Sequence, residues 1–572
     1  MSYQAPIRDL AFCLEHIIGA NRLAETELFA DATEETRAAI LDEAGKLAAS
    51  VLAPTNRNGD LTPARLENGV VRASPGFADA YRQIAEGGWV GLAAGTEHGG
   101  MGLPLTLGTA VGEMFASANL GLSLCPLLSQ GQIEALEAHA SDEIKALYLP
   151  KLISGEWTGT MNLTEPQAGS DVGALASRAE PKGDGTYAVS GQKIYISWGD
   201  HDIAENVCHL VLARLPDAAP GTRGLSLFLV PKFIPDADGK PGVANALKVV
   251  SLEHKMGLHG SPTAVMSFEG ATGWMIGPEA GGMAAMFTMM NNARLGVGVE
   301  GLGIAEAACQ KALGYAMERV QGKTADGSKT IIGHADVRRM LLRMRTLTDA
   351  ARAICLDTAL SLDMAKAADG AGGKAWKARG AFLTPIAKAF GTDVGNEVAY
   401  LGVQVHGGMG FIEEAGAAQY SRDVRVTAIY EGTNGVQAMD LIGRKLGDGG
   451  AAARALMEEI RAAGAGPRGD LAPLGEQLAI AADALEAATD WMLAAEPNDR
   501  AAGAVDYLRA WALLLGGAYL LRGAGVEGPE AARRAGLARY YFGRELVLVA
   551  GLAEAATEGA ADIYALDAEA LA

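Results

Sequence analysis

Residues 429–434 read Ile-Tyr-Glu-Gly-Thr-Asn, a string in which one carboxylate lies between an aromatic ring and a glycine. The glycine lets the backbone beside Glu431 approach a ligand closely, because it carries no Cβ. An apolar ring next to a carboxylate raises the pKa of that group toward neutrality, where it works as a general base. Taken alone, the same string also fits a helix end or a turn with an exposed acid.

A second stretch, residues 161–171, reads Met-Asn-Leu-Thr-Glu-Pro-Gln-Ala-Gly-Ser-Asp. A strand that ends near Thr164 and runs into a loop with proline and glycine exposes hydroxyls and backbone N–H groups on a tight turn. Such a loop suits the polar edge of a ring or a phosphate. The competing interpretation is an ordinary β-turn in which Asp171 caps its own backbone.

Residues 193–199, Lys-Ile-Tyr-Ile-Ser-Trp-Gly, alternate in the manner of a β-strand. The alternation predicts Tyr195 and Ser197 on one face, where a ring and a hydroxyl can stack on and hydrogen-bond a planar ligand. A core aromatic beside a surface serine is an equally good interpretation of this pattern alone.

Arginines and paired glycines supply groups for phosphates. Arg294 and Arg319 are 25 residues apart, about seven helical turns, so both can lie on one face of a long helix. Gln404 is followed by Gly407 and Gly408, whose backbone N–H groups can meet a pyrophosphate. For Arg319, an acidic neighbour makes an ordinary surface ion pair the simpler interpretation.

Periodicity divides the chain into four blocks. Helical patterns dominate residues 1–158, short β-type runs fill 159–278, long helical patterns return over 279–446, and a helical unit rich in Ala and Leu covers 451–572. We therefore predict an α+β protein with an N-terminal helical domain, a central β-barrel or sandwich, a helical bundle and a helical C-terminal extension. There is no βαβ alternation and no GxGxxG after a strand, which disfavours a Rossmann domain.

Individual elements are also predicted. The expected strands are 159–163, 187–190, 193–197, 207–214, 225–231 and 264–268. The expected helices include 107–118 and 129–149, and the longest are 282–321, 335–369 and 374–402.

The composition excludes several classes of protein. A net charge of −20 argues against a nucleic-acid surface, although a local cationic pocket can still bind an anionic ligand. The five cysteines are widely spaced and form no CxxC, which favours reduced thiols in a cytoplasmic protein over disulfides or a metal site. The first thirty residues contain no apolar run of signal-peptide length, and the run at 510–521 is too short for a membrane span.

Together and in this order, these strings resemble the acyl-CoA dehydrogenase family. The matching stretches are 163–171, 193–197, 255–257 (Lys-Met-Gly), 404–408 and 430–433. The resemblance covers roughly residues 35–445. It implies the family's fold, in which a helical domain and a central β-barrel or sandwich precede a C-terminal four-helix bundle.

The resemblance implies an FAD-dependent enzyme in which Glu431 removes the α-proton of an acyl-CoA while the β-hydrogen leaves as hydride to flavin N5. The backbone N–H of Glu431 and a ribityl hydroxyl of FAD would polarise the thioester carbonyl. The positions that match contacts to the subunit's own FAD are Met161, Leu163, Thr164, Ser170, Tyr195, Ser197 and Thr433. Those that match contacts to a neighbouring subunit's FAD are Arg319, Gln404, Gly407 and Gly408, and those near the acyl-CoA are Ser170, Asn291, Arg294 and Gly432.

Partners follow from the same resemblance. Contacts to a neighbouring subunit's FAD imply a homo-oligomer, at least a homodimer, and the implied electron acceptor is an electron-transfer flavoprotein. The sequence departs from the family at three places: Asn291 replaces a common acidic residue, Gln321-Gly322 stand where a Phe is common, and Ala335 replaces a common Gln. These departures affect the details of CoA and FAD contacts, but not the base.

Residues 2–6, the insertion at 324–332, residues 334–340 and the C-terminal extension resemble one subgroup. It contains the 3-methylmercaptopropionyl-CoA dehydrogenases of bacterial dimethylsulfoniopropionate breakdown. The expected reaction is 3-methylthiopropanoyl-CoA to 3-methylthioacryloyl-CoA, with short-, medium- or long-chain fatty acyl-CoAs as alternative substrates. Two rivals stay open: an acyl-CoA oxidase, in which oxygen reoxidises the flavin, and a catalytically silent homologue that binds acyl-CoA.

Overall fold

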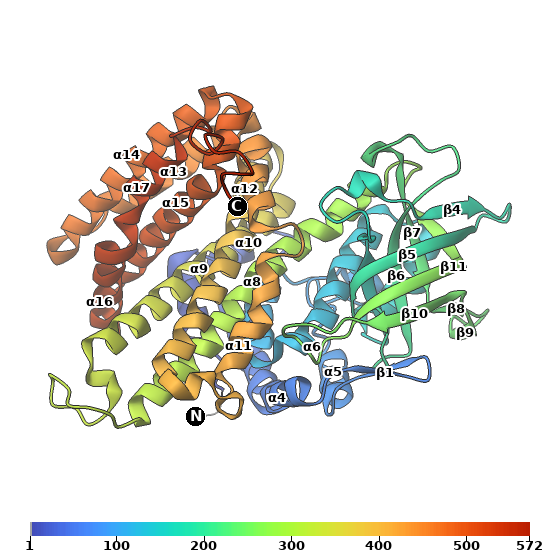
Figure 1. The fold of residues 1–572 in the computed structure, drawn as a ribbon, viewed down its shortest axis with the longest axis horizontal. Helices are drawn as coiled ribbons and strands as arrows, with labels where there is room; N and C mark the ends of the chain where they lie inside the picture. Colours follow the sequence, from blue (N-terminus) through green and yellow to red (C-terminus); the bar gives the residue numbers. More distant parts are fainter. Residues whose placement is uncertain (1–2) are drawn as a thin grey trace. The chain divides into compact units, whose positions relative to one another are not determined.

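The long helices α6 (Leu105–His139) and α8 (Gly282–Glu318) each run from one folded unit of the chain into the other in the computed structural model, which describes residues 3–572 (Figure 1). One unit contains the chain up to Asp42 together with Pro104–Ser117 and Arg294–Ala572 (the helical unit). The other contains Glu43–Leu103 and Ala118–Ala293 (the barrel unit). The units therefore cut across the four sequence blocks, whose boundaries as folding domains stay a prediction.

The barrel unit is built around a sheet that closes on itself. Strand β11 pairs with β5, β5 with β4, β4 with β6, β6 with β7, and β7 again with β11, while β10 and β3 extend the sheet. The predicted central β-barrel is thereby confirmed. The strands are β3 (Trp157–Asn162), β4 (Arg178–Pro181), β5 (Tyr187–Ser197), β6 (Asn206–Arg214), β7 (Leu225–Pro231), β10 (Leu247–Leu252) and β11 (Thr263–Ile276).

The residue types of these strands explain the closure. Every residue of β7 (Leu-Ser-Leu-Phe-Leu-Val-Pro) is buried, as expected of a strand covered on both faces. The side chains of Val189, Phe228, Val230, Met266 and Phe268 meet in one apolar cluster inside the barrel. Two short ribbons, β1–β2 (Arg65–Glu67, Val70–Arg72) and β8–β9 (Phe233–Pro235, Pro241–Ala244), complete the strands.

Helices of the barrel unit include α4 (Ala53–Leu61), α5 (Phe77–Glu86) and α7 (Asp142–Ile153). The structure joins the predicted helix at 107–118 to the first half of the one at 129–149, across a kink at Asn119 with φ −157° and ψ 90°. The side-chain oxygen of Asn119 accepts a hydrogen bond from the Leu122 N–H at 3.1 Å, which restarts the helix as an N-cap does.

The helical unit is organised around α8, α9 (Ala335–Ala367) and α10 (Gly370–His406), close to the three long helices that were predicted. Glycines allow α8 and α10 to touch. A Cβ on Gly298 would lie 2.6 Å from the carbonyl oxygen of Ala387, and one on Gly301 would lie 2.3 Å from that of Gly391. This unit also contains α1 (Ile7–Phe12), α2 (Asn21–Ala24), α11 (Ala417–Val424), α12 (Asn434–Gly443) and the part of α3 (Glu34–Leu47) up to Asp42.

The C-terminal extension belongs to this helical unit. Helix α15 (Pro497–Ala524), drawn in red in Figure 1, packs against α9, α12, α14 (Ala472–Ala494) and α17 (Leu548–Ala556). Helices α6 and α15 are long and apolar enough to cross a bilayer. However, 83% of the most apolar 18-residue stretch of each helix is buried inside the fold, as in core helices of water-soluble proteins. The extension comprises α13 (Ala451–Ala465), α14 (Ala472–Ala494), α15 (Pro497–Ala524), α16 (Ala531–Tyr541) and α17 (Leu548–Ala556).

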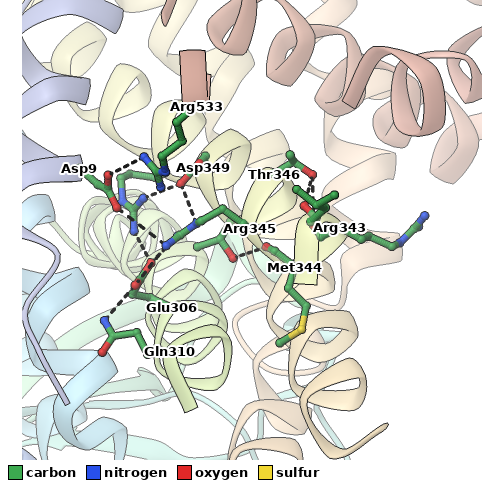
Figure 2. Close-up of polar contacts among 12 residues, drawn as sticks. Asp9, Glu306, Gln310, Arg343, Met344, Arg345, Thr346, Asp349 and Arg533 are labelled. Carbon is green, nitrogen blue, oxygen red and sulfur yellow. Dashed lines mark hydrogen bonds and ion pairs between the residues drawn. The ribbon is translucent and has the colours of Figure 1, made fainter. Parts of the chain in front are cut away.

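A buried ion-pair network fixes the packing of α9. Arg352 is 2% exposed and its Nη2 donates to Glu113 Oε1 of α6 at 2.6 Å and to Glu306 Oε2 of α8 at 2.7 Å. Arg345 also pairs with Glu306 and lies 3.2 Å from Asp349 (Figure 2). Because Glu306 faces two guanidinium groups, its pKa is lowered although burial opposes this. The network sets the register between α8 and α9.

Candidate active site

The turn at 430–433 holds Glu431 in an uncommon backbone conformation. Glu431 has a φ of +55° and Gly432 a φ of +81°. The left-handed region costs a residue with a Cβ about 1 to 2 kcal/mol, and such strain collects at functional sites. Thr433 then caps α12, because its hydroxyl accepts a 3.2 Å hydrogen bond from the Val436 N–H. The start of α12 therefore fixes where Glu431 lies.

Side chains from α10 and α12 hold the carbonyl groups of this turn. Lys388 Nζ donates to Gly432 O and to Asn434 Oδ1, at 2.9 Å each, and Gln437 Nε2 donates to Glu431 O at 3.2 Å. The backbone N–H of Glu431 has no hydrogen-bond partner within the described chain. An N–H of this kind is available to donate to an oxygen of a ligand.

The electrostatics of the turn suit a base. Burial raises the pKa of Glu431 to about 7, against the opposing effect of the Arg294 and Lys388 charges. Burial lowers the pKa of Lys388 to about 8, and Glu431 is the first of the acids that oppose that shift. A carboxylate that titrates near neutral pH is a good general base at that pH.

Arg294 is buried on α8 and belongs to the same region. Its Nη1 donates to Asp440 Oδ2 of α12 at 3.0 Å, and the Asp440 side chain is only 3% exposed. The ion pair therefore ties α8 to the helix that Thr433 caps. Within the helical unit, the structure therefore brings together four of the predicted residues: Glu431, Gly432 and Thr433 of the turn, and Arg294 of α8.

Sequence reasoning missed two residues of this site. Glu300 of α8 is buried and accepts a hydrogen bond from the hydroxyl of Tyr430, and Lys388 of α10 is fully buried. Each is a single ionisable residue inside an otherwise apolar helical stretch, Gly-Val-Glu-Gly-Leu and Ile-Ala-Lys-Ala-Phe. Charged residues are rarely buried without a reason, so this contrast was the available signal.

The residues predicted to contact FAD from the barrel lie on β3, on the loop after it and on β5. Thr164 and Ile194 join the loop to the strand through an N–H···O bond of 2.9 Å. The hydroxyls of Thr164, Ser170 and Ser197 have no hydrogen-bond partner in the described chain. Unpaired hydroxyls of this kind fit the polar edge of a flavin. Of the other two residues, Met161 and Leu163, both are half-buried.

Tyr195 lies at a bulge, where β5 shifts register against β11 between Ala264 and Met266. Its φ is +61° and the residue is 62% exposed. The predicted regular alternation of this strand is therefore wrong at Tyr195, since the bulge re-aims one side chain. An exposed ring next to free hydroxyls still provides a surface on which a planar cofactor can stack.

A buried ion pair supports the loop after β3. Lys193 Nζ donates to Glu165 Oε1 at 2.7 Å and to Leu163 O at 3.0 Å. The Glu165 carboxylate also accepts hydrogen bonds from the backbone N–H groups of Ala176, at 2.7 Å, and Ser177, at 3.0 Å. Although burial opposes ionisation, Lys193 and these donors lower the pKa of Glu165 to about 2. The pair fixes the backbone that carries the proposed flavin contacts.

Other predicted residues of the helical unit lie far along their helices from the part that holds Glu431. Gln404 is 16 positions beyond Lys388 along α10, about 24 Å, and it is exposed together with Gly407 and Gly408. Arg319 is exposed and lies one residue beyond the end of α8, unlike the buried Arg294. Their contact with a neighbouring subunit stays a prediction. Asn291 is exposed and lies in the barrel unit.

Four family models match successive parts of the chain. Three are described as the N-terminal, middle and C-terminal domains of acyl-CoA dehydrogenase and match residues 33–156, 160–271 and 280–447. The fourth, described as "Acetyl-CoA dehydrogenase C-terminal like", matches residues 456–567.

Individual relatives extend this similarity. The 3-methylmercaptopropionyl-CoA dehydrogenase of Ruegeria pomeroyi is 48% identical over 519 residues, covering 89% of this chain and 88% of that protein. A butyryl-CoA dehydrogenase of Syntrophomonas wolfei is 37% identical over 462 residues, covering 78% and 76%. Caenorhabditis elegans ACDH-11 in complex with C11-CoA shares the fold, with a TM-score of 0.81 and 21% identity over 95% of this chain and 92% of that one.

Proposed function

The chain belongs to the acyl-CoA dehydrogenase family and is an FAD-dependent oxidoreductase that acts on acyl-CoA, and we propose that Glu431 is its catalytic base. Three features of Glu431 support the proposal. Its backbone is strained, burial raises the pKa of its carboxyl to about 7, and its own backbone N–H is free to donate. The ionised carboxylate takes the α-proton of the acyl thioester.

The turn supplies more than the base. The free N–H of Glu431 donates to the thioester carbonyl oxygen, where negative charge develops as the α-proton leaves. The positive charges of Arg294 and Lys388 favour the ionised form of the base. When bound, FAD would supply the acceptor for the β-hydrogen, which leaves as hydride, so the products would be a trans-2-enoyl-CoA, reduced FAD and a protonated Glu431 carboxyl.

The residues assigned to FAD fall into two groups. Met161, Leu163, Thr164, Ser170, Tyr195, Ser197 and Thr433 would hold the flavin of their own subunit. The family resemblance assigns Arg319, Gln404, Gly407 and Gly408 to the FAD of a second subunit, and their exposure supports this assignment. Ser170, Asn291, Arg294 and Gly432 would lie near the acyl-CoA.

The proposed substrate is 3-methylthiopropanoyl-CoA, oxidised to 3-methylthioacryloyl-CoA. The 48% identity to the Ruegeria pomeroyi enzyme over 89% of the chain supports it. Butanoyl-CoA is the second candidate, because the Syntrophomonas wolfei relative carries that name at 37% identity. The proposal further includes a cytoplasmic homodimer that passes electrons to an electron-transfer flavoprotein.

An anaerobic flavin titration tests the reaction. The FAD-loaded protein is titrated with 3-methylthiopropanoyl-CoA, butanoyl-CoA and octanoyl-CoA beside Glu431→Gln. Glu459→Gln serves as the control, since this carboxyl is on α13 and its side chain is 49% exposed. We expect bleaching of the flavin in the wild type and control, and none in Glu431→Gln.

The alternative functions are distinguished by the ranking of the three substrates and by the electron acceptor that turnover requires. Fastest bleaching by 3-methylthiopropanoyl-CoA supports the proposed substrate, whereas a preference for octanoyl-CoA contradicts it. Turnover with oxygen alone would indicate an oxidase, and turnover that requires an artificial acceptor supports a dehydrogenase. A bound flavin that none of the three substrates reduces would contradict the proposed reaction.

A further inference from the structure

Glu300 is a buried carboxyl that the proposed mechanism does not use. It is 2% exposed, and the Tyr430 hydroxyl donates to its Oε2. Its Oε1 is buried without a hydrogen-bond partner, and no lysine or arginine forms an ion pair with Glu300 in the described chain. A buried carboxylate with one neutral donor and no directly bonded cation is unfavourable, whereas a neutral carboxylic acid is tolerated in such surroundings.

The helix that carries Glu300 packs closely against α10. Gly298 and Gly301 lie on either side of it and bring α8 against α10, so that an added Cβ at either glycine would meet carbonyl oxygens of α10 within 2.6 Å. Lys388 lies on the facing part of α10 and anchors the Gly432 carbonyl. Glu300 and the turn of the base are thus fixed to the same pair of helices.

Three groups face Glu300 from the elements packed around it. These are Tyr430 and Glu431 from the turn and Lys388 from α10. Burial raises the pKa of Glu300 to about 8; the Tyr430 hydrogen bond lowers it, the Glu431 charge raises it and the Lys388 charge lowers it. Two neighbouring buried carboxyls titrate as a pair, and the second proton is lost less readily than the first.

We propose that Glu300 is a positioning residue: it keeps its proton while Glu431 is ionised, and it holds Tyr430 and thereby the turn that carries the base. The pair then bears a single negative charge, located on Glu431. This inference rests on the proposed role of Glu431 and adds a residue that acts through Tyr430 without touching the substrate.

Infrared difference spectroscopy tests the protonation without any substrate. The spectrum of the FAD-loaded wild type minus that of Glu300→Gln is recorded at neutral pH. We expect the carbonyl stretch of a protonated carboxyl group in the wild type. A difference spectrum that contains only carboxylate bands would overturn the inference.

The pH dependence of flavin reduction gives a second readout. On the acidic side of the pH profile (the acid limb), the rate of flavin reduction falls as Glu431 becomes protonated. Glutamine replaces a neutral acid without changing the charge, so the midpoint of this limb should be the same in Glu300→Gln as in the wild type. If Glu300 were ionised, its charge would raise the pKa of Glu431, and Glu300→Gln would move the limb to lower pH. A shift of about half a unit or more in that direction contradicts the inference.

Positioning is tested by Glu300→Leu, which leaves Tyr430 without its partner. Flavin reduction should be about tenfold slower in Glu300→Leu than in Glu300→Gln, because the turn is less well oriented. Equal rates in the two variants would overturn the positioning role, and Glu459→Gln should match the wild type. If no acyl-CoA reduces the wild-type flavin while the infrared band is present, the proposed function fails but the protonation of Glu300 stands.

Discussion

Lys388 and Gly432 are joined by a 2.9 Å hydrogen bond from the buried ammonium group to the backbone carbonyl. This bond ties the turn of the base to α10, and the same ammonium group lowers the pKa of Glu431 through its charge. Orientation and ionisation of the base therefore depend on one lysine, which lies 43 residues earlier in the chain than Glu431.

Lys388→Met should displace the acid limb of flavin reduction to higher pH. The substitution removes a positive charge that favours ionised Glu431, so a higher pH is needed to ionise the base. The measurement is the anaerobic reduction rate from pH 5.5 to 9 (about half a unit between points). Lys377→Met, at an exposed position of the same helix, should leave the limb in place. An unshifted limb in Lys388→Met would contradict the electrostatic role.

The base itself should make activity and stability change in opposite directions with pH. Flavin reduction should rise as pH increases through about 7, because Glu431 must be ionised to act. The pKa of Glu431 is higher in the folded protein than in the unfolded chain. The protonated carboxyl therefore stabilises the fold at low pH, and this contribution is lost as pH rises through about 7.

Glu431→Gln removes this titration and gives the matching stability test. Below the unfolded pKa of a glutamate, the thermal unfolding temperature of Glu431→Gln should differ little from that of the wild type. Above pH 7 the variant should be the more stable of the two. Parallel unfolding temperatures across this range would show that Glu431 titrates at an ordinary pH.

Lys193→Met should weaken the hold on FAD. The substitution leaves the Glu165 carboxylate buried without its cation, a change that costs about 3 to 5 kcal/mol in comparable cases. The loop after β3 should loosen, and flavin should be released on dilution, as measured by the recovery of its fluorescence. Lys182→Met is the control, because Lys182 is exposed and its side chain donates a hydrogen bond to the Thr272 hydroxyl at the surface. Full retention of FAD by Lys193→Met would show that cofactor binding does not depend on this ion pair.

Arg352→Leu should lower the thermal unfolding temperature by several degrees. Glu113 and Glu306 would remain buried without this partner, which is more damaging than losing an exposed pair. Arg338→Leu removes an ion pair in which the arginine side chain is 59% exposed, so it should change stability by less than about 1 kcal/mol. Similar effects of both substitutions would mean that the buried network is dispensable.

Much of the architecture was predictable because it rests on local periodicity. The helix predicted at 335–369 is α9 at Ala335–Ala367, and the strand predicted at 225–231 is β7 at the same bounds. Strand β4 was not predicted, because Arg-Ala-Glu-Pro carries no β signal and forms a strand only through pairing with β5. The bulge at Tyr195 was missed for a similar reason, since register is set by the partner strand.

The candidate site was predictable only where it is contiguous in sequence. The string around Glu431 carries a local signal, and the resemblance to a family supplies its proposed role. Glu300 and Lys388 reach the site through the packing of α8 against α10, and neither residue lies near Glu431 in the sequence. No single-sequence pattern encodes which buried charges will face each other across two helices.

The positive φ of Glu431 has an evolutionary consequence. Glycine would relieve the backbone strain at this position and would also remove a half-buried ionisable group whose pKa is raised. A copy of the gene freed from selection on catalysis could therefore lose the base by one substitution and gain stability at the same time. We expect natural variants with glycine at this position to keep the fold and to unfold at a higher temperature than the active enzyme. Selection for stability alone would then favour the inactive form.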